Sequence, residues 1–435
     1  MRRFRIATTL LLAVAALALL SCGKTEPGEQ PRTTRITLWH IQTGANPGAV
    51  ISDAVGRFEE EHPDVAVNNV PTRNDAYKDK LDRAMATGLL PDVFHTWGGG
   101  VLAEYVKYGR VHDLTEAIEA AELTKRVHPT ALKFTTFHGK TYAVPMDVSV
   151  VVMWYNREIF RKHGVAVPKT FDDLKGACRK LRAAGVTPIA LGNRDKWPGA
   201  FYYIYLAVRA GGKKPFDDAA ARAPGATFEH PSFVKAGKRL RELIDLPAFN
   251  DGIHAAPYDN ARALFVKEEA AMILMGTWLV GNVRSDLGDA ADAFLKKIDF
   301  FEFPALDEGT AVDARIVVAG VNSAFAVSST SRRTQTAFNL IEEFVSDLSA
   351  QAWAEKTGRI PALREQLVSH LLDRKTMRAA RTLYDAPDVQ HYYDQYLPRA
   401  LGEAVNDIIT DIFTGTLTPE QAAARMQQAS VNRDK

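Results

Sequence analysis

Residues 35–70, RITLWHIQTGANPGAVISDAVGRFEEEHPDVAVNNV, decide the fold class of this chain. Side chains alternate in the first six residues, with Ile36, Leu38 and His40 on one face, and this pattern predicts a strand. Apolar residues then recur at helical spacing from Pro47 to Glu61, and Val65 to Val70 again has a strand pattern. A strand, a helix and a strand in this order form a parallel unit, so the stretch predicts an α/β fold in which helices cover both sides of a parallel or mixed sheet.

The alternation of strands and helices continues along the chain. After residue 130 it changes, and a hairpin with a turn at His138–Thr141 precedes a β-branched run, Val148–Val152. A second set of strands and helices follows, and Val317–Val327 predicts a pair of strands because Gly320 lies inside it. The sequence predicts further elements at Tyr77–Thr87, Pro91–Thr96, Val101–Tyr108, Phe171–Ala183 (capped by Thr170), Ser331–Phe344 and a last helix after Thr418.

The N-terminal segment has the order of a secretory signal. Three arginines precede an apolar run, Ile6–Leu20, and the small residue Ser21 stands directly before Cys22. This order resembles the bacterial lipobox, which implies that residues 1–21 are a lipoprotein signal peptide and that Cys22 is lipidated. The apolar run is short for a membrane span, which needs about 20 residues. The alternative is a signal peptide followed by a chance cysteine. Residues 22–35 are polar and rich in Pro and Gly, so they are expected to form a flexible tether.

Length and charge limit the possible functions. The roughly 400 residues after the tether are too many for one compact core, so two domains are expected. The formal net charge is +2 and falls to near −1 without the three arginines of the signal, which argues against a nucleic-acid partner. With Cys22 lipidated, Cys178 is the only thiol left, and its helical surroundings predict a packed free thiol.

Seven short segments, in this order, resemble a known family, the extracellular sugar-binding proteins of bacterial ABC importers (solute-binding protein family 1). The segments are GLLPDVF (88–94), GRVHDLT (109–115), GKTYAVP (139–145), WYNREIF (154–160), PKTFDDL (168–174), MGTW (275–278) and GRIP (358–361). The resemblance covers nearly the whole chain after the signal. Within the family, HTWGGG (95–100) and DKWP (195–198) resemble the branch that takes oligosaccharides such as xylo-oligosaccharides or raffinose-type galactosides.

The resemblance implies a two-lobed α/β fold of the periplasmic-binding-protein type (class II), with the ligand cleft between the lobes. The chain is expected to cross between lobes near Pro145, Val317 and Pro361. The implied protein is a monomeric receptor without catalytic activity, cofactor or metal, lipid-anchored to the outer face of the cytoplasmic membrane, that delivers its sugar to the transmembrane subunits of an ABC permease. The lobes are expected to comprise residues 36–146 plus 318–360 and residues 147–317 plus 361–435.

Candidate sugar platforms follow from the chemistry of a pyranose, which has an apolar face and a rim of hydroxyls. Such a ligand needs flat aromatic side chains together with polar groups at their edges. Trp97 precedes three glycines, Trp197 precedes Pro-Gly, and Trp278 follows Gly-Thr. These flanks predict loops in which a ring face is free, so we expect the three rings to contact sugar. The other three tryptophans, Trp39, Trp154 and Trp353, lie within predicted strands or a helix, and we expect them to be buried.

Polar candidates are chosen by position. Asp147 follows the crossing at Pro145, Asp195 precedes Trp197 by two residues, and His40 ends the first strand, where ligands of α/β proteins gather. We also expect Asn322, Arg359 and Tyr393 (with its neighbour Tyr392) at the site. For each residue the alternative is an ordinary structural role: a hinge cap for Asp147, a satisfied core histidine for His40, and packing for the two tyrosines.

Several common enzyme motifs are incomplete in the sequence or absent from it. Gly139-Lys140-Thr141 lacks the upstream glycine of a phosphate-binding loop, and the sequence has no GxSxG, HExxH or CxxC. Abundant Asp and Glu leave a lipid-anchored glycoside hydrolase as the alternative from another class. A receptor of the same fold for a metal or a peptide is the remaining alternative, although no two histidines share ligand spacing on one predicted element.

Overall fold

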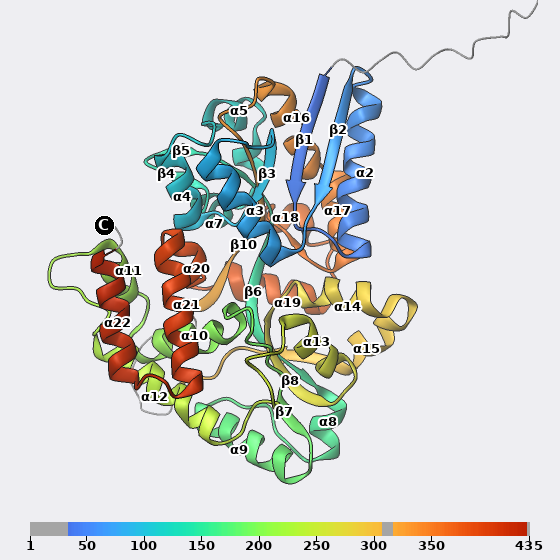
Figure 1. Ribbon diagram of the computed structural model, residues 1–435. Coiled ribbons are helices and arrows are strands. Elements are labelled where there is room, and N and C mark those ends of the chain that lie inside the picture. Colours follow the sequence, from blue (N-terminus) through green and yellow to red (C-terminus); the bar gives the residue numbers. More distant parts are fainter. Residues whose placement is uncertain (1–33, 307–315, 433–435) are drawn as a thin grey trace, which may run out of the picture.

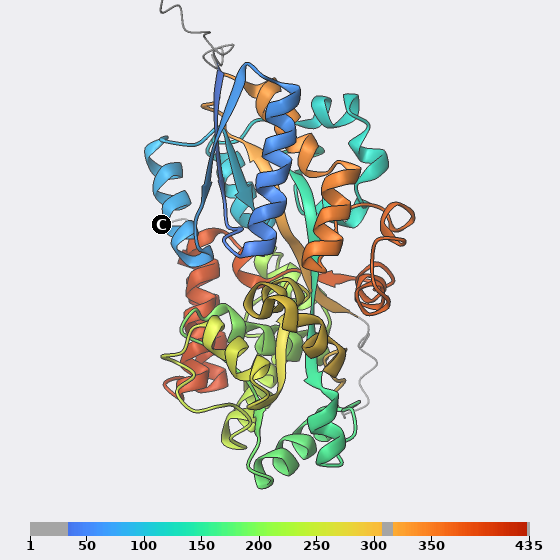
Figure 2. The same ribbon diagram turned by 90° about the vertical axis from the view of Figure 1, so that its right-hand side faces the viewer.

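The computed structural model describes residues 34–306 and 316–432. Cys22, the signal peptide and most of the tether lie outside these residues. Two α/β lobes stand one above the other, joined by the long strands β6 (Val144–Asn156) and β10 (Val317–Val327) that run between them (Figures 1 and 2). The expected two-lobed fold is confirmed. No helix among the described residues has both the length and the apolar character needed to cross a membrane.

The first lobe is built on the sequence stretch quoted above. Strand β1 (Thr34–His40) lies between β2 (Val65–Pro71) and β3 (Val93–Thr96) and is parallel to both. Alternate side chains of β1 are buried, with Ile36, Leu38 and His40 at 0% exposure, because one face of the sheet packs against helices. The covering helices are α2 (Ala45–Glu61), α3 (Asn74–Thr87), α4 (Gly99–Lys107), α16 (Thr334–Phe344) and α17 (Asp347–Thr357).

Strands β6 and β10 connect the sheets of the two lobes. They pair antiparallel from Ala319–Val150 to Phe325–Val144, and every residue of both strands is buried. The prediction of two strands at residues 317–327 is wrong, because β10 is a single strand that continues through Gly320. A Cβ at Gly320 would stand 2.3 Å from Nδ1 of His391, so this glycine permits close packing and does not mark a turn.

The second lobe continues the same sheet. Beyond β6 lies β8 (Ala270–Gly276), which pairs antiparallel with β6 and parallel with β7 (Thr187–Ile189), and β9 (Ile298–Phe301) also pairs with β6. The main helices of this lobe are α9 (Phe171–Ala183), α10 (Trp197–Gly211), α12 (Pro231–Asp245), α13 (Tyr258–Val266) and α14 (Leu279–Leu287).

The C-terminal part of the chain contacts both lobes. Strand β11 (Ile360–Pro361) pairs with β6. Helix α19 (Arg374–Tyr384) contacts both lobes, because Tyr384 stacks on His128 of the first lobe and Lys375 donates to backbone carbonyls of the second. After α20 (Tyr393–Tyr396), helices α21 (Arg399–Thr414) and α22 (Pro419–Asn432) pack against α12 of the second lobe (Figure 1). The lobe boundaries given above stay a prediction.

Short elements complete the chain. They are α5 (Thr115–Ala120), α6 (Leu123–Arg126), α7 (Pro129–Lys133), β4 (Thr136–Phe137), β5 (Lys140–Thr141), α8 (Arg157–Lys162), α11 (Lys214–Ala221), the 3₁₀ turn Gly288–Ala290, α15 (Ala291–Lys297), α18 (Glu365–Val368) and β12 (Val389–Gln390).

Several local predictions have a clear outcome. The hairpin exists as β4 and β5, with a turn at residues 138–139 that is tighter than predicted. Thr170 caps α9 as predicted and forms a capping box with Asp173, and Thr418 accepts from the Gln421 N–H at 3.2 Å in the first turn of α22. Trp154 and Trp353 are buried as predicted, at 1% exposure. Trp39 is less buried than predicted. Its ring is only partly buried, because its outer face packs against Lys80 and not against the core.

Candidate functional site between the two lobes

A cavity of about 300 Å³ opens between the two lobes. The first lobe contributes the loop after β1, the start of α3, and Trp97 after β3. The second lobe contributes the starts of α10, α13 and α14, and the C-terminal segment adds Tyr392, Asp394 and Gln395. Because these loops and helix ends come from both sides, a change in the distance between the lobes changes the cavity directly.

One wall of the cavity is aromatic. It consists of Trp197, Phe201, Tyr258, Trp278 and Tyr392, which we call the aromatic wall. The ring centroids of Trp197 and Trp278 are 6.1 Å apart, and each ring meets its neighbours at a steep angle, as aromatic rings prefer. Phe201, Tyr258 and Tyr392 are buried, whereas Trp197 and Trp278 are only partly buried, so these two rings offer open surface to a ligand.

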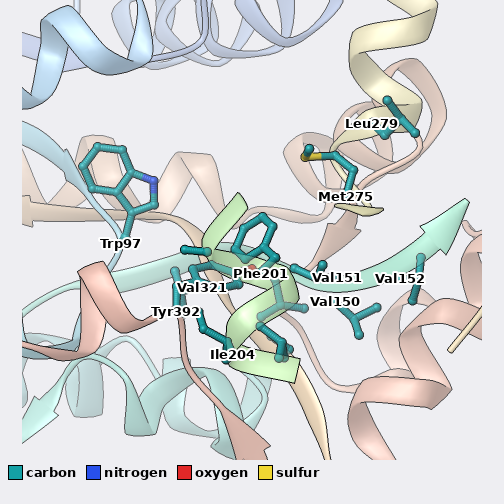
Figure 3. Packing of buried hydrophobic residues seen from close by; sticks show 14 of the residues in the cluster. Trp97, Val150, Val151, Val152, Phe201, Ile204, Met275, Leu279, Val321 and Tyr392 are labelled. Carbon is teal, nitrogen blue, oxygen red and sulfur yellow. The ribbon is translucent and has the colours of Figure 1, made fainter. Parts of the chain in front are cut away.

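Figure 3 shows how this wall is supported. Phe201 and Tyr392, with ring centroids 5.4 Å apart, lie beside Val150 and Val321 of the crossing strands, while Trp97 stands apart. Trp97 belongs to the first lobe, where it packs edge-on against Tyr77 and His95 and is 8% exposed. The cavity therefore has aromatic side chains from both lobes, with most of them in the second.

The sequence around the two open tryptophans fixes their positions. Lys196 has a left-handed backbone (φ 64°), and the Trp197 N–H donates to the carbonyl of Asp195 at 2.7 Å, so the chain turns sharply as α10 begins. Trp278 depends on Gly276, since a Cβ at Gly276 would stand 2.2 Å from its six-membered ring. Only glycine at position 276 allows the indole of Trp278 to lie against the end of β8.

The floor of the cavity is a buried polar network. Arg359 donates from Nη1 to the Gln42 side-chain oxygen at 3.0 Å and lies 3.8 Å from the Asp147 carboxylate, which also accepts from Asn322 Nδ2 at 2.9 Å. Burial raises the pKa of Asp147 and lowers that of Arg359, and the attraction between the two charges opposes both shifts. The network ties β6, β10, the loop after β1 and the segment before β11 together under the cavity.

His40 supports this floor from below. Its Nε2 is 2.5 Å from Asn69 Oδ1, and its Nδ1 accepts from the Gln42 N–H at 3.1 Å, an arrangement that requires the neutral ring with the proton on Nε2. Burial lowers the pKa of His40 to about 4. Since Gln42 also binds Arg359, the protonation state of His40 is linked to the polar floor.

Some buried polar atoms next to the cavity have no protein partner. Among the described residues, Trp197 Nε1, Gln395 Oε1 and Arg359 Nε are buried without a hydrogen bond. Native proteins leave few such atoms unsatisfied unless water or a ligand serves them. Their position beside the cavity fits a site that binds a polar molecule.

The rim of the cavity carries charges of both signs. Arg73 from the first lobe meets Asp259 from the second at 2.9 Å, and Arg262 binds Asp286 through two contacts of 2.6 and 3.1 Å. The Arg73–Asp259 pair is solvent-exposed, so it contributes little energy, but it marks where the lobes touch across the mouth.

The structure brings most predicted site residues together. Trp97, Trp197, Trp278, Asp195, Asn322 and Arg359 line the cavity. Asp147 and His40 lie one layer below, where they hold the lining residues Asn322 and Gln42. Much of the Asp195 carboxylate is already occupied, because it accepts from the Tyr258 N–H at 3.0 Å and from Arg194 at 3.2 Å.

Tyr393 does not belong to the cavity lining. Its ring stacks on Phe216 with centroids 3.9 Å apart, and it is its neighbour Tyr392 that faces the cavity. Gln42, Asp75, Phe201 and Arg262 are among the lining residues that sequence reasoning missed. Phe201 follows Trp197 by one helical turn, a signal that would have found it, whereas the other three have no local mark that separates them from solvated polar residues.

The fold and the cavity define a class: a two-lobed binding protein whose ligand site lies between the lobes. The family model of the bacterial extracellular solute-binding proteins matches residues 43–350, and the chain belongs to that family. This confirms the family resemblance found in the sequence segments.

Individual relatives agree with the family. The melibiose/raffinose/stachyose-binding protein MelE of Bacillus subtilis is 22% identical over 424 residues, which cover 96% of this chain and 94% of MelE. An uncharacterized ABC transporter extracellular-binding protein of Pyrococcus horikoshii is 28% identical over 286 residues, 63% of this chain and 64% of that protein. A solved structure from work on xylan utilization by Caldanaerobius polysaccharolyticus is 28% identical, with a TM-score of 0.84, over 91% of this chain and 99% of its own.

Proposed function

We propose that this protein is the substrate-binding component of an ABC carbohydrate importer and captures a short oligosaccharide in the cavity between its lobes. The observation that carries the proposal is the aromatic wall, with two partly open tryptophans, facing polar side chains of the other lobe. A pyranose has one apolar face for an indole ring and a rim of hydroxyls for groups such as Gln42, Asn322 and Arg359. MelE, the relative whose name mentions raffinose and stachyose, and the structure linked to xylan utilization support the same ligand class.

The mechanism we propose is capture and delivery without catalysis. The ligand contacts both lobes at once, so it binds the closed arrangement better than the open one and shifts the equilibrium toward closure. The hinge strands β6 and β10 absorb the motion. The permease in the membrane then recognises the closed form. The lipid anchor at Cys22 keeps the receptor near its permease on the outer face of the membrane.

Xylo-oligosaccharides and raffinose-type galactosides are the two proposed ligand groups. Both present flat pyranose faces, and the cavity of about 300 Å³ lies at the small end of the usual range for ligand sites, which favours short chains. The residues proposed to contact the sugar are Trp97, Trp197, Trp278, Asp195, Asn322 and Arg359, with Asp147 and His40 as their supports.

A thermal-shift panel with recovery of the ligand tests this function. The purified protein is heated with xylo-oligosaccharides, raffinose, stachyose, monosaccharides, amino acids and short peptides. A ligand at 100 times its Kd adds about 2.7 kcal/mol to the free energy of unfolding, so one or two oligosaccharides are expected to raise Tm and to be recovered intact. A response to amino acids or peptides alone refutes sugar binding. Recovery of cleaved sugar favours the alternative, a lipid-anchored glycoside hydrolase.

A further inference from the structure

In the described part of the chain, the cations that line the cavity each lie near a carboxylate, whereas one lining carboxylate, Asp75, has no cation within ion-pair distance. This difference bears on which sugars the cavity accepts. Among the described residues, each cation at the cavity has a carboxylate within 4 Å. The pairs are Arg73–Asp259 (2.9 Å), Lys78–Asp394 (3.3 Å), Arg194–Asp195 (3.2 Å), Arg262–Asp286 (2.6 Å) and Arg359–Asp147 (3.8 Å). A ligand carboxylate would therefore have to share a cation with a carboxylate of the protein.

Asp75 differs from the other carboxylates of the cavity. It lies in the first turn of α3 and lines the cavity, yet no cation of the described residues lies within ion-pair distance of it. Its carboxylate accepts a hydrogen bond from Asn74 Nδ2 at 3.0 Å. The side chain is exposed to solvent in the cleft, so a ligand in the cavity can reach its oxygens.

The surroundings of Asp75 already disfavour negative charge. Loss of hydration in the concave wall raises its pKa, and the nearby Asp195 carboxylate raises it further, while Lys78 and Arg194 act in the opposite direction. Lys78 and Arg194 are each engaged by another carboxylate. A second anion brought into the cavity by a ligand would add like-charge repulsion to this balance.

We infer that Asp75 is a specificity-determining residue: it accepts hydrogen bonds from hydroxyls of an uncharged oligosaccharide and excludes sugars that carry a uronic acid. This inference rests on the proposed function and narrows its ligand class to neutral sugars. Hydroxyl groups are donors that a carboxylate with free lone pairs accepts well, whereas a uronate offers only acceptors at its acidic position. The paired arginines compensate only in part, because a uronate would share each of them with the protein carboxylate that already neutralises its charge.

Calorimetric titration of the full chain with matched neutral and acidic sugars tests the inference. The probes are xylotriose with its glucuronic-acid-substituted form, and galactobiose with digalacturonic acid. Like-charge repulsion at cavity distances corresponds to roughly a ten- to hundredfold loss of affinity, so the wild type is expected to bind the neutral member of a pair at least about tenfold more tightly. Because the effect is electrostatic, the ratio is expected to shrink as salt is added.

Two variants separate the role of Asp75 from a general effect on α3. Asp75→Asn keeps the shape and one acceptor oxygen but removes the charge, and it is expected to lower the neutral-to-acidic ratio about tenfold. Asp79→Asn, one turn along the same helix, exposed and away from the cavity lining, is expected to behave as wild type. Wild-type protein that binds both members equally, or an Asp75→Asn variant with an unchanged ratio, overturns the inference and leaves the proposed function standing. A protein that binds no sugar overturns both.

Discussion

Replacing Trp278 with alanine is the sharpest perturbation of the aromatic wall. Its ring packs against Trp197, Phe201 and Tyr392, with centroids 6.1 to 6.2 Å away, and its remaining surface is open to the cavity. Full burial of a large apolar side chain is worth roughly 1.5–3 kcal/mol. Since the protein already covers most of this ring, a ligand gains at most about a third of that energy, up to about 1 kcal/mol, and the stacking geometry adds about 1 kcal/mol.

The expected loss of binding energy for Trp278→Ala is therefore about 2 kcal/mol, which is roughly a thirtyfold rise in Kd for the oligosaccharide that raises Tm. Titration calorimetry on wild type and variant measures it. The matched control is Trp39→Ala, which removes another partly buried tryptophan, one that lies outside the cavity lining and under Lys80. Both variants are expected to lower Tm without ligand, but only Trp278→Ala is expected to change Kd.

Two results would refute this reasoning. An unchanged Kd in Trp278→Ala would mean that the ring does not contact the sugar. An equal loss of affinity in Trp39→Ala would mean that the affinity follows the stability of the protein and not the aromatic wall.

Three further predictions concern the supports of the site. Gly276→Ala should weaken sugar binding by displacing the Trp278 ring without removing any aromatic surface, and a Kd equal to wild type in calorimetry would count against the close fit of this ring. Arg359→Met should lower the free energy of unfolding by about 3–5 kcal/mol, because it leaves the Asp147 carboxylate buried and unpaired. In urea titrations the double variant with Asp147→Asn should regain part of that loss. Additive losses in the double variant would show that the two residues are not coupled. The pKa of His40 is about 4 in the folded protein and near 6.5 in the unfolded protein, so its contribution to stability is complete above pH 6.5 and is lost as pH falls toward 4. The expected loss is about 2 kcal/mol at pH 5. Urea unfolding of His40→Gln should therefore show a smaller loss of stability between pH 7 and pH 5 than wild type, and an equal loss in both proteins would remove His40 as the cause.

Local patterns in the sequence predicted the elements of the fold well. Alternation in residues 35–40 and helical spacing in residues 47–61 describe faces that the structure buries, because burial of one face is what produces those periods. Gly320 misled the prediction for residues 317–327, since a glycine that marks a turn and a glycine that admits a neighbouring ring look alike in one sequence.

The candidate site was predictable only where a residue type is distinctive. Trp197 and Trp278 stand out by their rings and flanking glycines or prolines, and both line the cavity. Asp75 looks like any charged residue at a helix start, and its significance appears only when the second lobe is placed opposite. Tyr392 and Tyr393 could not be separated, because the direction of each side chain depends on the path of the backbone between β12 and α20.

A crystal structure of the protein with the oligosaccharide that raises its Tm tests the central claim most directly. We expect one intact sugar in the cavity between the lobes, with a pyranose face on Trp197 or Trp278 and hydroxyls within 3.2 Å, the usual hydrogen-bond limit, of the polar side chains of the first lobe. A sugar bound elsewhere on the surface, or a cavity that stays without it at saturating concentration, would contradict the account.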